Sequence, residues 1–174
     1  MITLSGTPTL ATERLALRAP QASDWPAWFD FAMTDRSRFI GGAFPENLAW
    51  RAFCHVIGTW VARGYGQFVF TLKGRDSALG LAGPWHPIDW PEPEIGWTVW
   101  SPAAEGKSYA FEAAVAARAY AYDTLRWTTA VSYIHPGNAR SIALGLRLGG
   151  VLRPDLPGSE PGDVVILHDL RGLV

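Results

Sequence analysis

A turn of small residues at 103–110 is the part of the sequence where the backbone itself could bind an anion. It follows a predicted strand at 94–100 and leads into a predicted helix. The first N–H groups of a helix lack partners within it and lie at the positive end of its dipole, so they favour a phosphate or pyrophosphate. Gly106 permits close approach, Lys107 adds a charge, and Ser108 adds a hydroxyl. An ordinary helix cap looks the same, so the turn alone is a weak signal.

The elements that position this turn follow from hydrophobic patterning. The longest helix is expected from Glu46 to about Arg63, where apolar residues recur at three and four and Gly64 ends the run. Further helices are expected after Asp24, over 108–126 and over 138–148, and strands at 14–20, 67–72, 78–85, 94–100, 128–134 and 163–170. This order predicts a mixed α+β layer fold rather than a βαβ repeat. We expect a flexible segment at 1–11 and one domain over 12–171.

Composition excludes several classes of function. The chain has 174 residues, with 15 Lys and Arg against 16 Asp and Glu, so it has no global positive field for nucleic acid or an anionic membrane. No apolar run reaches the length of a membrane span, and the N-terminus lacks a signal-peptide pattern. Cys54 is the only cysteine, which excludes a disulfide framework and a cysteine-based zinc site and suits the cytoplasm. We expect no metal.

Three segments together carry a family resemblance. They are Glu94–Trp100 (EIGWTVW), Glu105–Ala113 (EGKSYAFEA) and Asn138–Ser141 (NARS). They resemble the GNAT superfamily of acyl-CoA N-acyltransferases, and most of all its ribosomal-protein alanine N-acetyltransferase branch. The likeness extends over about 12–170. It implies a mixed, mostly antiparallel sheet of six to seven strands, flanked by about four helices and splayed between the fourth and fifth strands.

The resemblance also implies acetyl-CoA as the acetyl donor, without a metal. The pantetheine arm is expected in the splay, paired with the backbone near Thr98, Val99 and Trp100. The pyrophosphate is expected on the turn formed by Glu105, Gly106, Lys107, Ser108, Tyr109 and Ala110. Asn138 matches a position that contacts the pantetheine arm, and Ser141 lies one turn later, toward the thioester sulfur. Asn138 independently fits the N-cap of its helix.

Transfer of an acetyl group to an amine requires a neutral amine and a proton for the leaving thiolate. Glu94 is the best candidate for the base, because it begins the strand on the face of Gly96 and Thr98 and matches an acidic family position. A solvent-exposed carboxylate at a loop edge is an equally weighted alternative for Glu94, and Glu92 could replace it as base. Ser141 is the family-consistent proton donor, with Tyr133 and His135 as alternatives.

The acceptor pocket is expected to use part of the surplus of aromatic residues. Nine Trp are more than a small core requires, so some of them should line a cleft. Trp28 and Trp60 lie on helical core stripes, whereas Trp100 could join the cleft, and Trp97 is the likeliest of the pocket candidates to be core. The pocket candidates are Phe39, Trp85, Trp90 and Tyr133, with Phe44 and Trp97. An aromatic, weakly charged pocket argues against a polyanionic acceptor.

Three residues depart from the family pattern. Glu105 and Ser108 stand where Gln or Arg and Gly are usual in the turn, and Gly145 stands where many members have a Tyr general acid. We expect an N-acetyltransferase that acts on a primary amine of a small molecule or a protein N-terminus, by direct attack in a ternary complex. The departures keep open a degenerate domain that binds acyl-CoA as a sensor, and the turn keeps open an unrelated nucleotide-binding module. A homodimer is compatible with the resemblance.

Overall fold

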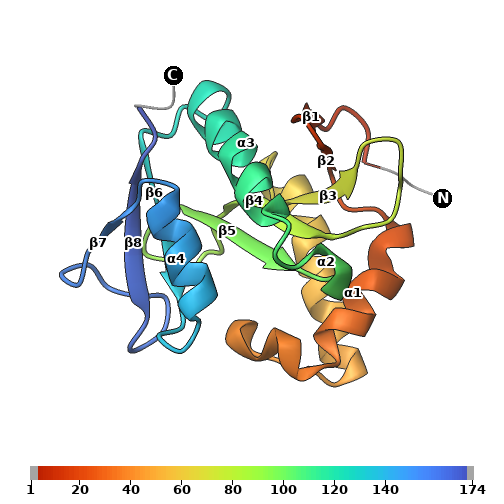
Figure 1. The fold of residues 1–174 in the computed structure, drawn as a ribbon, viewed down its shortest axis with the longest axis horizontal. Helices are drawn as coiled ribbons and strands as arrows, with labels where there is room; N and C mark the ends of the chain where they lie inside the picture. The colour runs from red at the N-terminus through yellow and green to blue at the C-terminus, as the bar shows by residue number, and fades with distance from the viewer. Residues whose placement is uncertain (1–3, 172–174) are drawn as a thin grey trace.

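The computed structural model describes residues 4–171, and an eight-stranded sheet runs through them in the order β1-β2-β3-β4-β5-β6-β8-β7 (Figure 1). The contacts are antiparallel except for the parallel pair β5–β6. The fold is therefore the expected mixed, mostly antiparallel α+β sheet. The strands are β1 (Leu10–Ala11), β2 (Leu15–Arg18), β3 (Phe68–Leu72), β4 (Gly80–Trp85), β5 (Glu94–Val99), β6 (Thr129–Ile134), β7 (Val151–Leu152) and β8 (Val164–Asp169).

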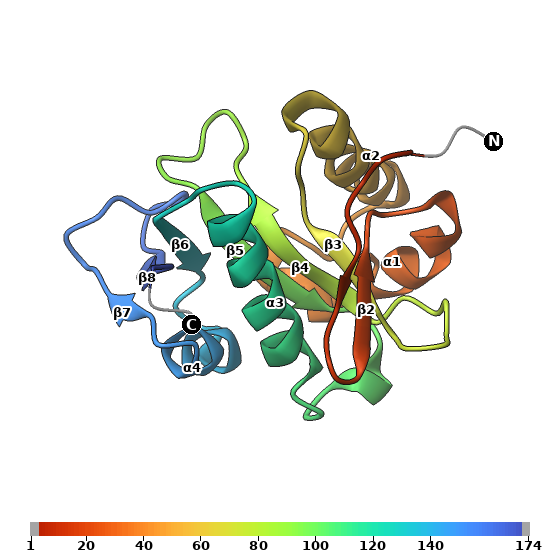
Figure 2. The ribbon, with the colours of Figure 1, turned by 90° about the horizontal axis from the view of Figure 1, so that it is seen from above.

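Four α-helices cover the two faces of the sheet. They are α1 (Trp25–Ala32), α2 (Glu46–Arg63), α3 (Tyr109–Asp123) and α4 (Ala139–Arg147). Figure 2 shows α3 and α4 on one side of the sheet and α1 and α2 on the other. Three short 3₁₀ segments complete the helical elements of the described chain: η1 (Ala22–Asp24), η2 (Asp35–Ile40) and η3 (Pro102–Ala104).

Side-chain alternation along β3 separates the two halves of the core. Val69 packs with Trp28, Phe53 and other residues of α1 and α2. Phe68 and Phe70 point to the opposite face, where they pack with residues of β2 and α3 such as Tyr120. Successive side chains of a strand face opposite sides of the sheet, so a continuous apolar run such as this one is typical of a strand buried on both faces.

The helix predicted from Glu46 to Arg63 is confirmed at both ends. Its apolar stripe buries Ala49, Phe53, Val56 and Trp60 against the sheet and α1. Gly64 ends it with φ +75°, in the left-handed region that glycine adopts without a steric penalty.

The expected splay separates β5 from β6. Glu94 opposite Val131 is the one register pair that joins these strands in the described chain. The Val131 N–H donates to the Pro93 carbonyl at 2.9 Å, and the Ser132 hydroxyl donates to the Ile95 carbonyl at 2.7 Å. Beyond Ile95 the strands diverge, which opens a gap beside the second half of β5.

The sheet has one strand more than the upper number expected, because two dipeptides add to its edges. Leu10–Ala11 pairs with β2, although the sequence predicts a flexible segment at 1–11; residues 1–3 of that segment lie outside the described residues. Val151–Leu152 pairs with β8. Strands of two residues carry too little alternation to be recognised by pattern.

Candidate active site

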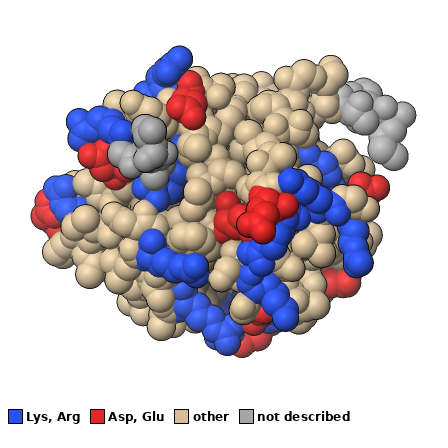
Figure 3. Space-filling model, turned by 45° about the horizontal axis from the view of Figure 1, so that its top comes forward, with Lys and Arg blue, Asp and Glu red and all other residues tan. Residues whose placement is uncertain are grey.

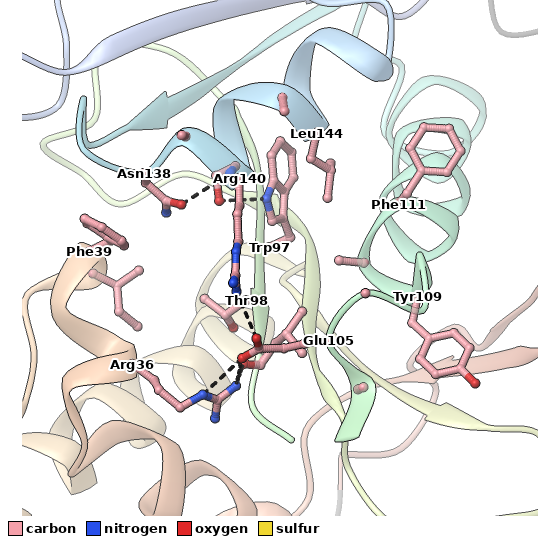
Figure 4. Close-up of a pocket in the computed structure, with 18 of the residues that line it drawn as sticks. Arg36, Phe39, Trp97, Thr98, Glu105, Tyr109, Phe111, Asn138, Arg140 and Leu144 are labelled. Carbon is pink, nitrogen blue, oxygen red and sulfur yellow. Dashed lines mark hydrogen bonds and ion pairs between the residues drawn. The ribbon is translucent and has the colours of Figure 1, made fainter. Parts of the chain in front are cut away.

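A cleft of about 1040 Å³ extends from the β5–β6 gap to the start of α3 (Figure 4). Its walls come from η2, the second half of β5, the turn before α3 with the first turn of that helix, and α4 along its length. Of the predicted donor-site residues, Thr98, Val99, Glu105, Gly106, Ser108, Tyr109, Ala110, Asn138 and Ser141 line it. Segments far apart in sequence thus meet at one concave surface.

The edge of β5 that faces the gap is set by the alternation of backbone groups. The Pro93 and Ile95 carbonyls accept from β6, so Trp97 and Val99 direct their backbone groups to the same edge. Trp100 belongs to the other edge, where its N–H donates to the Leu79 carbonyl at 2.7 Å. The Val99 carbonyl on this edge already accepts from Arg36. The backbone available to a pantetheine arm is therefore that of Trp97 and the Val99 N–H, rather than that of Thr98 or Trp100, which face β4.

The turn before α3 combines an open glycine with a left-handed serine. Gly106 has φ +70°, and no atom lies within 4 Å of where its Cβ would stand. Ser108 has φ +60° and is the N-cap of α3, without a side-chain capping bond. Lys107 is exposed and is not among the lining residues. The positive charge that we expected from Lys107 is supplied instead by arginines.

Glu105, the acidic departure in the turn, is held by two of these arginines. Arg36 donates to Glu105 Oε1 through Nε at 3.2 Å and Nη2 at 2.7 Å. Arg140 donates to Oε2 at 2.9 Å. Figure 4 shows both guanidinium groups directed at this carboxylate. The hydrogen bonds from Arg36 are the strongest influence that lowers the pKa of Glu105, so it stays an anion whose charge is compensated.

Arg38 and Arg147 also line the cleft. Arg147 lies over the Phe111 ring, 4.0 Å from its centroid, and donates to Ser108 Oγ at 3.3 Å. In Figure 3, Lys and Arg side chains lie close together on the lower part of the face shown, although basic and acidic residues are nearly equal in the whole chain. Four arginines against one carboxylate make the cleft locally positive.

Sequence reasoning missed these arginines. Arg140 and Arg147 are seven residues apart, which places them on one face of α4, so helical spacing could have found them. Arg36 and Arg38 lie in a 3₁₀ segment between helices, where no periodicity gives their direction.

Asn138 and Ser141 lie where α4 begins beside the gap. Asn138 Oδ1 accepts from the Ser141 N–H at 3.3 Å, which confirms the predicted N-cap. Trp97 Nε1 donates to Ser141 Oγ at 3.3 Å and so reaches across the gap from β5 to α4. Trp97 lines the cleft as well as packing on the core.

Glu94 is buried at the point where β5 and β6 still pair. Its side chain accepts from Trp90 Nε1 at 2.7 Å, and only 9% of the residue is exposed, so the solvent-exposed alternative is wrong. Burial raises the pKa of Glu94 from an ordinary 4.5 to about 7, against the smaller opposing effect of the Trp90 hydrogen bond. Glu92 is exposed, and its N–H donates to the Tyr133 hydroxyl at 3.1 Å.

The predicted pocket aromatics divide between two regions. Phe39 lines the cleft and lies 5.2 Å from the His135 ring. Trp90 and Tyr133 form an edge-to-face pair, with ring centroids 6.3 Å apart, next to Glu94. Trp85 packs on the His55 ring at 4.9 Å and is not in the cleft lining.

Two other aromatic candidates belong to the core on the α1–α2 side of the sheet. Trp100 is 2% exposed and contacts Trp28, and Phe44 packs against the same cluster. The expectation that Trp100 joins the cleft with its side chain is therefore wrong: the even-numbered face of β5 is covered by α1 at that position.

Residues 14–151, which are more than half of the chain, match the sequence profile of the acetyltransferase (GNAT) domain family. The chain belongs to the GNAT family. Its structure is similar to that of an acetyltransferase from Agrobacterium tumefaciens, with 39% identity, a TM-score of 0.88, and 97% of this chain and 98% of that chain covered. A putative GNAT-family acetyltransferase from Bordetella pertussis is 26% identical, with a TM-score of 0.74 and 92% and 97% covered.

Ribosomal-protein acetyltransferases also share the fold. The ribosomal-protein-S5-alanine acetyltransferase from Vibrio fischeri superposes with a TM-score of 0.69 over 96% of this chain and 99% of that chain, at 12% identity. At that identity the likeness concerns the fold and carries no acceptor.

GNAT acetyltransferases take their acetyl group from acetyl-CoA, and the residues of this cleft fit such a donor. An unobstructed glycine turn at a helix N-terminus, a free strand edge and four arginines suit a long ligand with a diphosphate. Gly145 stands in place of the Tyr common in the family, and a Cβ there would come within 2.7 Å of Ile166 Cδ1, so a larger residue would require Ile166 to move. Among residues 4–171, no cluster of three metal-ligating side chains and no helix able to cross a membrane is present.

Proposed function

We propose that this GNAT enzyme transfers the acetyl group of acetyl-CoA to a primary amine of a small molecule or a protein N-terminus. The amine attacks the thioester carbonyl directly in a ternary complex. The observation that carries the proposal is Glu94, a buried carboxyl with a pKa of about 7 at the vertex of the β5–β6 gap. A group with that pKa is well matched to removing a proton from an ammonium ion near neutral pH.

The donor site in this proposal is formed by the cleft and its turn. The backbone from Gly106 to Ala110 holds the diphosphate at the N-terminus of α3, with charge supplied by Arg140 and Arg147. The gap-facing backbone of Trp97 and the Val99 N–H, together with Asn138, hold the pantetheine arm. Acetyl-CoA supplies the activated thioester when bound.

The chemistry in this proposal divides between two side chains. Glu94 takes the proton of the acceptor amine, directly or through water, while Trp90 and Tyr133 frame its carboxyl. The C–N bond forms and the C–S bond breaks, and Ser141 relays a proton to the departing sulfur: it donates its hydroxyl hydrogen and regains the proton that the nitrogen loses on forming the amide. Because Trp97 Nε1 already donates to Ser141 Oγ, the hydroxyl hydrogen of Ser141 is directed elsewhere and is free to serve as a donor.

The test is release of free thiol from acetyl-CoA in a panel of acceptors. The panel contains peptides that begin with alanine or serine, because ribosomal-protein acetyltransferases share this fold, and small primary amines. We expect acetyl transfer to at least one unblocked amine, identified by a mass gain of one acetyl group, and none to the same peptides with acetylated N-termini. Stabilisation by acetyl-CoA in thermal unfolding without turnover on any amine would favour a sensor instead.

A further inference from the structure

Arg36 connects three parts of the cleft through one guanidinium group. Its Nη1 donates to the Trp100 carbonyl, its Nη2 donates to the Val99 carbonyl at 3.1 Å, and Nε and Nη2 both donate to Glu105. The planar fork of an arginine can make such a set of bonds, whereas a lysine ammonium cannot span it. With 27% of its side chain exposed and its donors largely used, Arg36 is a fixed part of the site.

Arg36 replaces β6 as the partner of β5. The carbonyl of Pro93 accepts from the β6 backbone, that of Ile95 accepts from the Ser132 side chain, and that of Val99, on the same edge, accepts from Arg36. The strand edge thus keeps a partner at its far end, where β6 has diverged. The gap beside Trp97 between these contacts stays open for the donor.

The partner comes from the cleft wall that carries Phe39, a residue predicted for the acceptor pocket. Arg36 belongs to η2, which also supplies the lining residues Phe39 and Ile40. The other end of the bond network is Glu105, in the turn proposed to hold the diphosphate. Arg140, the second partner of Glu105, is 88% exposed and makes one contact there, so it can exchange onto a bound phosphate while Arg36 stays.

We infer that Arg36 is a positioning residue that couples the two halves of the active site: CoA bound on residues 105–110 orders η2 through the Glu105–Arg36 pair. The inference rests on the proposed donor site. It assigns a role to the acidic residue at position 105, which would otherwise only repel a diphosphate. Glu105 binds Arg36, and Arg36 binds the end of β5 from η2, the segment that also carries Phe39.

Hydrogen exchange read by mass spectrometry tests this coupling without a known acceptor. CoA is added at a concentration that saturates binding in calorimetry, and peptides covering 34–42 and 106–112 are followed. In the wild-type protein we expect exchange to slow in both segments, by about tenfold in 34–42. A tenfold slowing corresponds to an increase of about 1.4 kcal/mol in the free energy of local opening. In Arg36→Lys and in Glu105→Gln, slowing in 106–112 should persist and slowing in 34–42 should fall below about twofold.

Asp35→Asn is the matched control, since Asp35 lies on the same segment but is exposed, does not line the cleft, and bonds to Arg38 rather than to Arg36, Glu105 or β5. It should keep the wild-type coupling. Two results would overturn the inference and leave the donor site standing. One is that CoA still slows exchange in 34–42 in Arg36→Lys. The other is that, in the wild-type protein, CoA slows exchange in 106–112 but not in 34–42. No slowing in 106–112 at saturating CoA would overturn both.

Discussion

Glu94 begins β5 and Glu105 lies in the turn after η3, and the surroundings of these two glutamates shift their pKa values in opposite directions. Glu94 is buried beside the neutral donor Trp90, so burial dominates and raises its pKa to about 7. Glu105 is more exposed and lies between Arg36 and Arg140, so hydrogen bonds and opposite charge lower its pKa. One carboxyl can change protonation near neutral pH, and the other remains a fixed anion.

In the proposed mechanism, this contrast separates proton removal, at the start of β5, from donor binding, at the turn after it. Proton removal near neutral pH needs a carboxyl with a raised pKa, and a buried site beside an indole raises the pKa by destabilising the charged form. Donor binding needs charge held in place, which a network of arginines and one carboxylate provides. Charge on the whole chain is nearly balanced, so only the local arrangement distinguishes the two sites.

Glu94→Gln should break the contrast most strongly. With no group to take the proton, kcat/KM at pH 7 should fall by about 10²–10⁴-fold, the usual contribution of general base catalysis. The rise of wild-type kcat/KM with pH through about 7 should disappear in the variant. The measurement is kcat/KM between pH 5.5 and 9 with the best acceptor of the panel. Glu92→Gln, an exposed neighbour, is the control, and an equal loss there would shift the base to Glu92.

The same variant has a stability signature. The raised pKa means that the folded state favours the neutral acid, so this stabilising contribution is complete below pH 4.5 and is lost as the pH rises through 7. Glu94→Gln removes that dependence. Relative to wild type, its free energy of unfolding should therefore increase between pH 5 and 8, by about 2–3 kcal/mol at most. Denaturant unfolding at several pH values measures it, and a constant difference would mean that Glu94 is charged throughout.

The two carboxyls also show what the sequence could predict about the site. Strand position and the family resemblance identify Glu94, but both its burial and its indole partner Trp90 depend on the loop at 86–93, whose path no periodicity fixes. Glu105 is recognisable as a departure, yet its counterions come from Arg36 and Arg140, 69 and 35 residues away. Local patterns predict which residues face a site, whereas contacts between distant segments depend on the tertiary structure.

The fold was more predictable than the site, because helices and strands follow from local patterns whereas the site depends on contacts between distant segments. The α2 boundaries, the central strands and the splay follow from hydrophobic period, a terminal glycine and the family resemblance. Trp97 and Trp100 show the limit of this reasoning. Trp97 lines the cleft as well as packing on the core, whereas Trp100 is covered by Trp28 of α1, a contact that patterning in β5 cannot reveal.

Ser141→Ala tests whether Ser141 is the proton donor to the leaving thiolate, the counterpart of Glu94 as base. If the hydroxyl delivers a proton to the thiolate, kcat should fall by about tenfold or more, with the dissociation constant of acetyl-CoA changed less than about threefold. Trp97→Phe removes the bond that orients the hydroxyl while keeping an aromatic ring at the same core position, and it should have a smaller effect. Stopped-flow thiol release and calorimetry give the two constants. Wild-type turnover in Ser141→Ala would leave Tyr133 or His135 as the donor.

Gly106→Val tests the turn that carries Glu105. A branched side chain in the open turn should raise the dissociation constant of acetyl-CoA by about tenfold, because it blocks backbone approach to the diphosphate and disfavours φ +70°. Gly74→Val is the matched control: Gly74 has φ +73° and equally open surroundings in the turn after β3. Both variants should lose about 1–2 kcal/mol of stability from the left-handed conformation. Equal acetyl-CoA affinity in the two would place the diphosphate elsewhere.

Ser108→Gly should have the smallest effect and the opposite sign. Ser108 holds φ +60° at the N-cap of α3 without a side-chain capping bond, so glycine relieves strain of about 1 kcal/mol, partly offset by its greater freedom in the unfolded chain. The substitution also removes the 3.3 Å hydrogen bond that the exposed Arg147 donates to the Ser108 hydroxyl. Thermal unfolding should shift upward by about 1–3 °C, and acetyl-CoA affinity should stay within about twofold, since binding uses the backbone of the turn. A large loss of affinity would mean that the Ser108 hydroxyl itself contacts the donor, and the turn would then bind through side chains as well as through N–H groups.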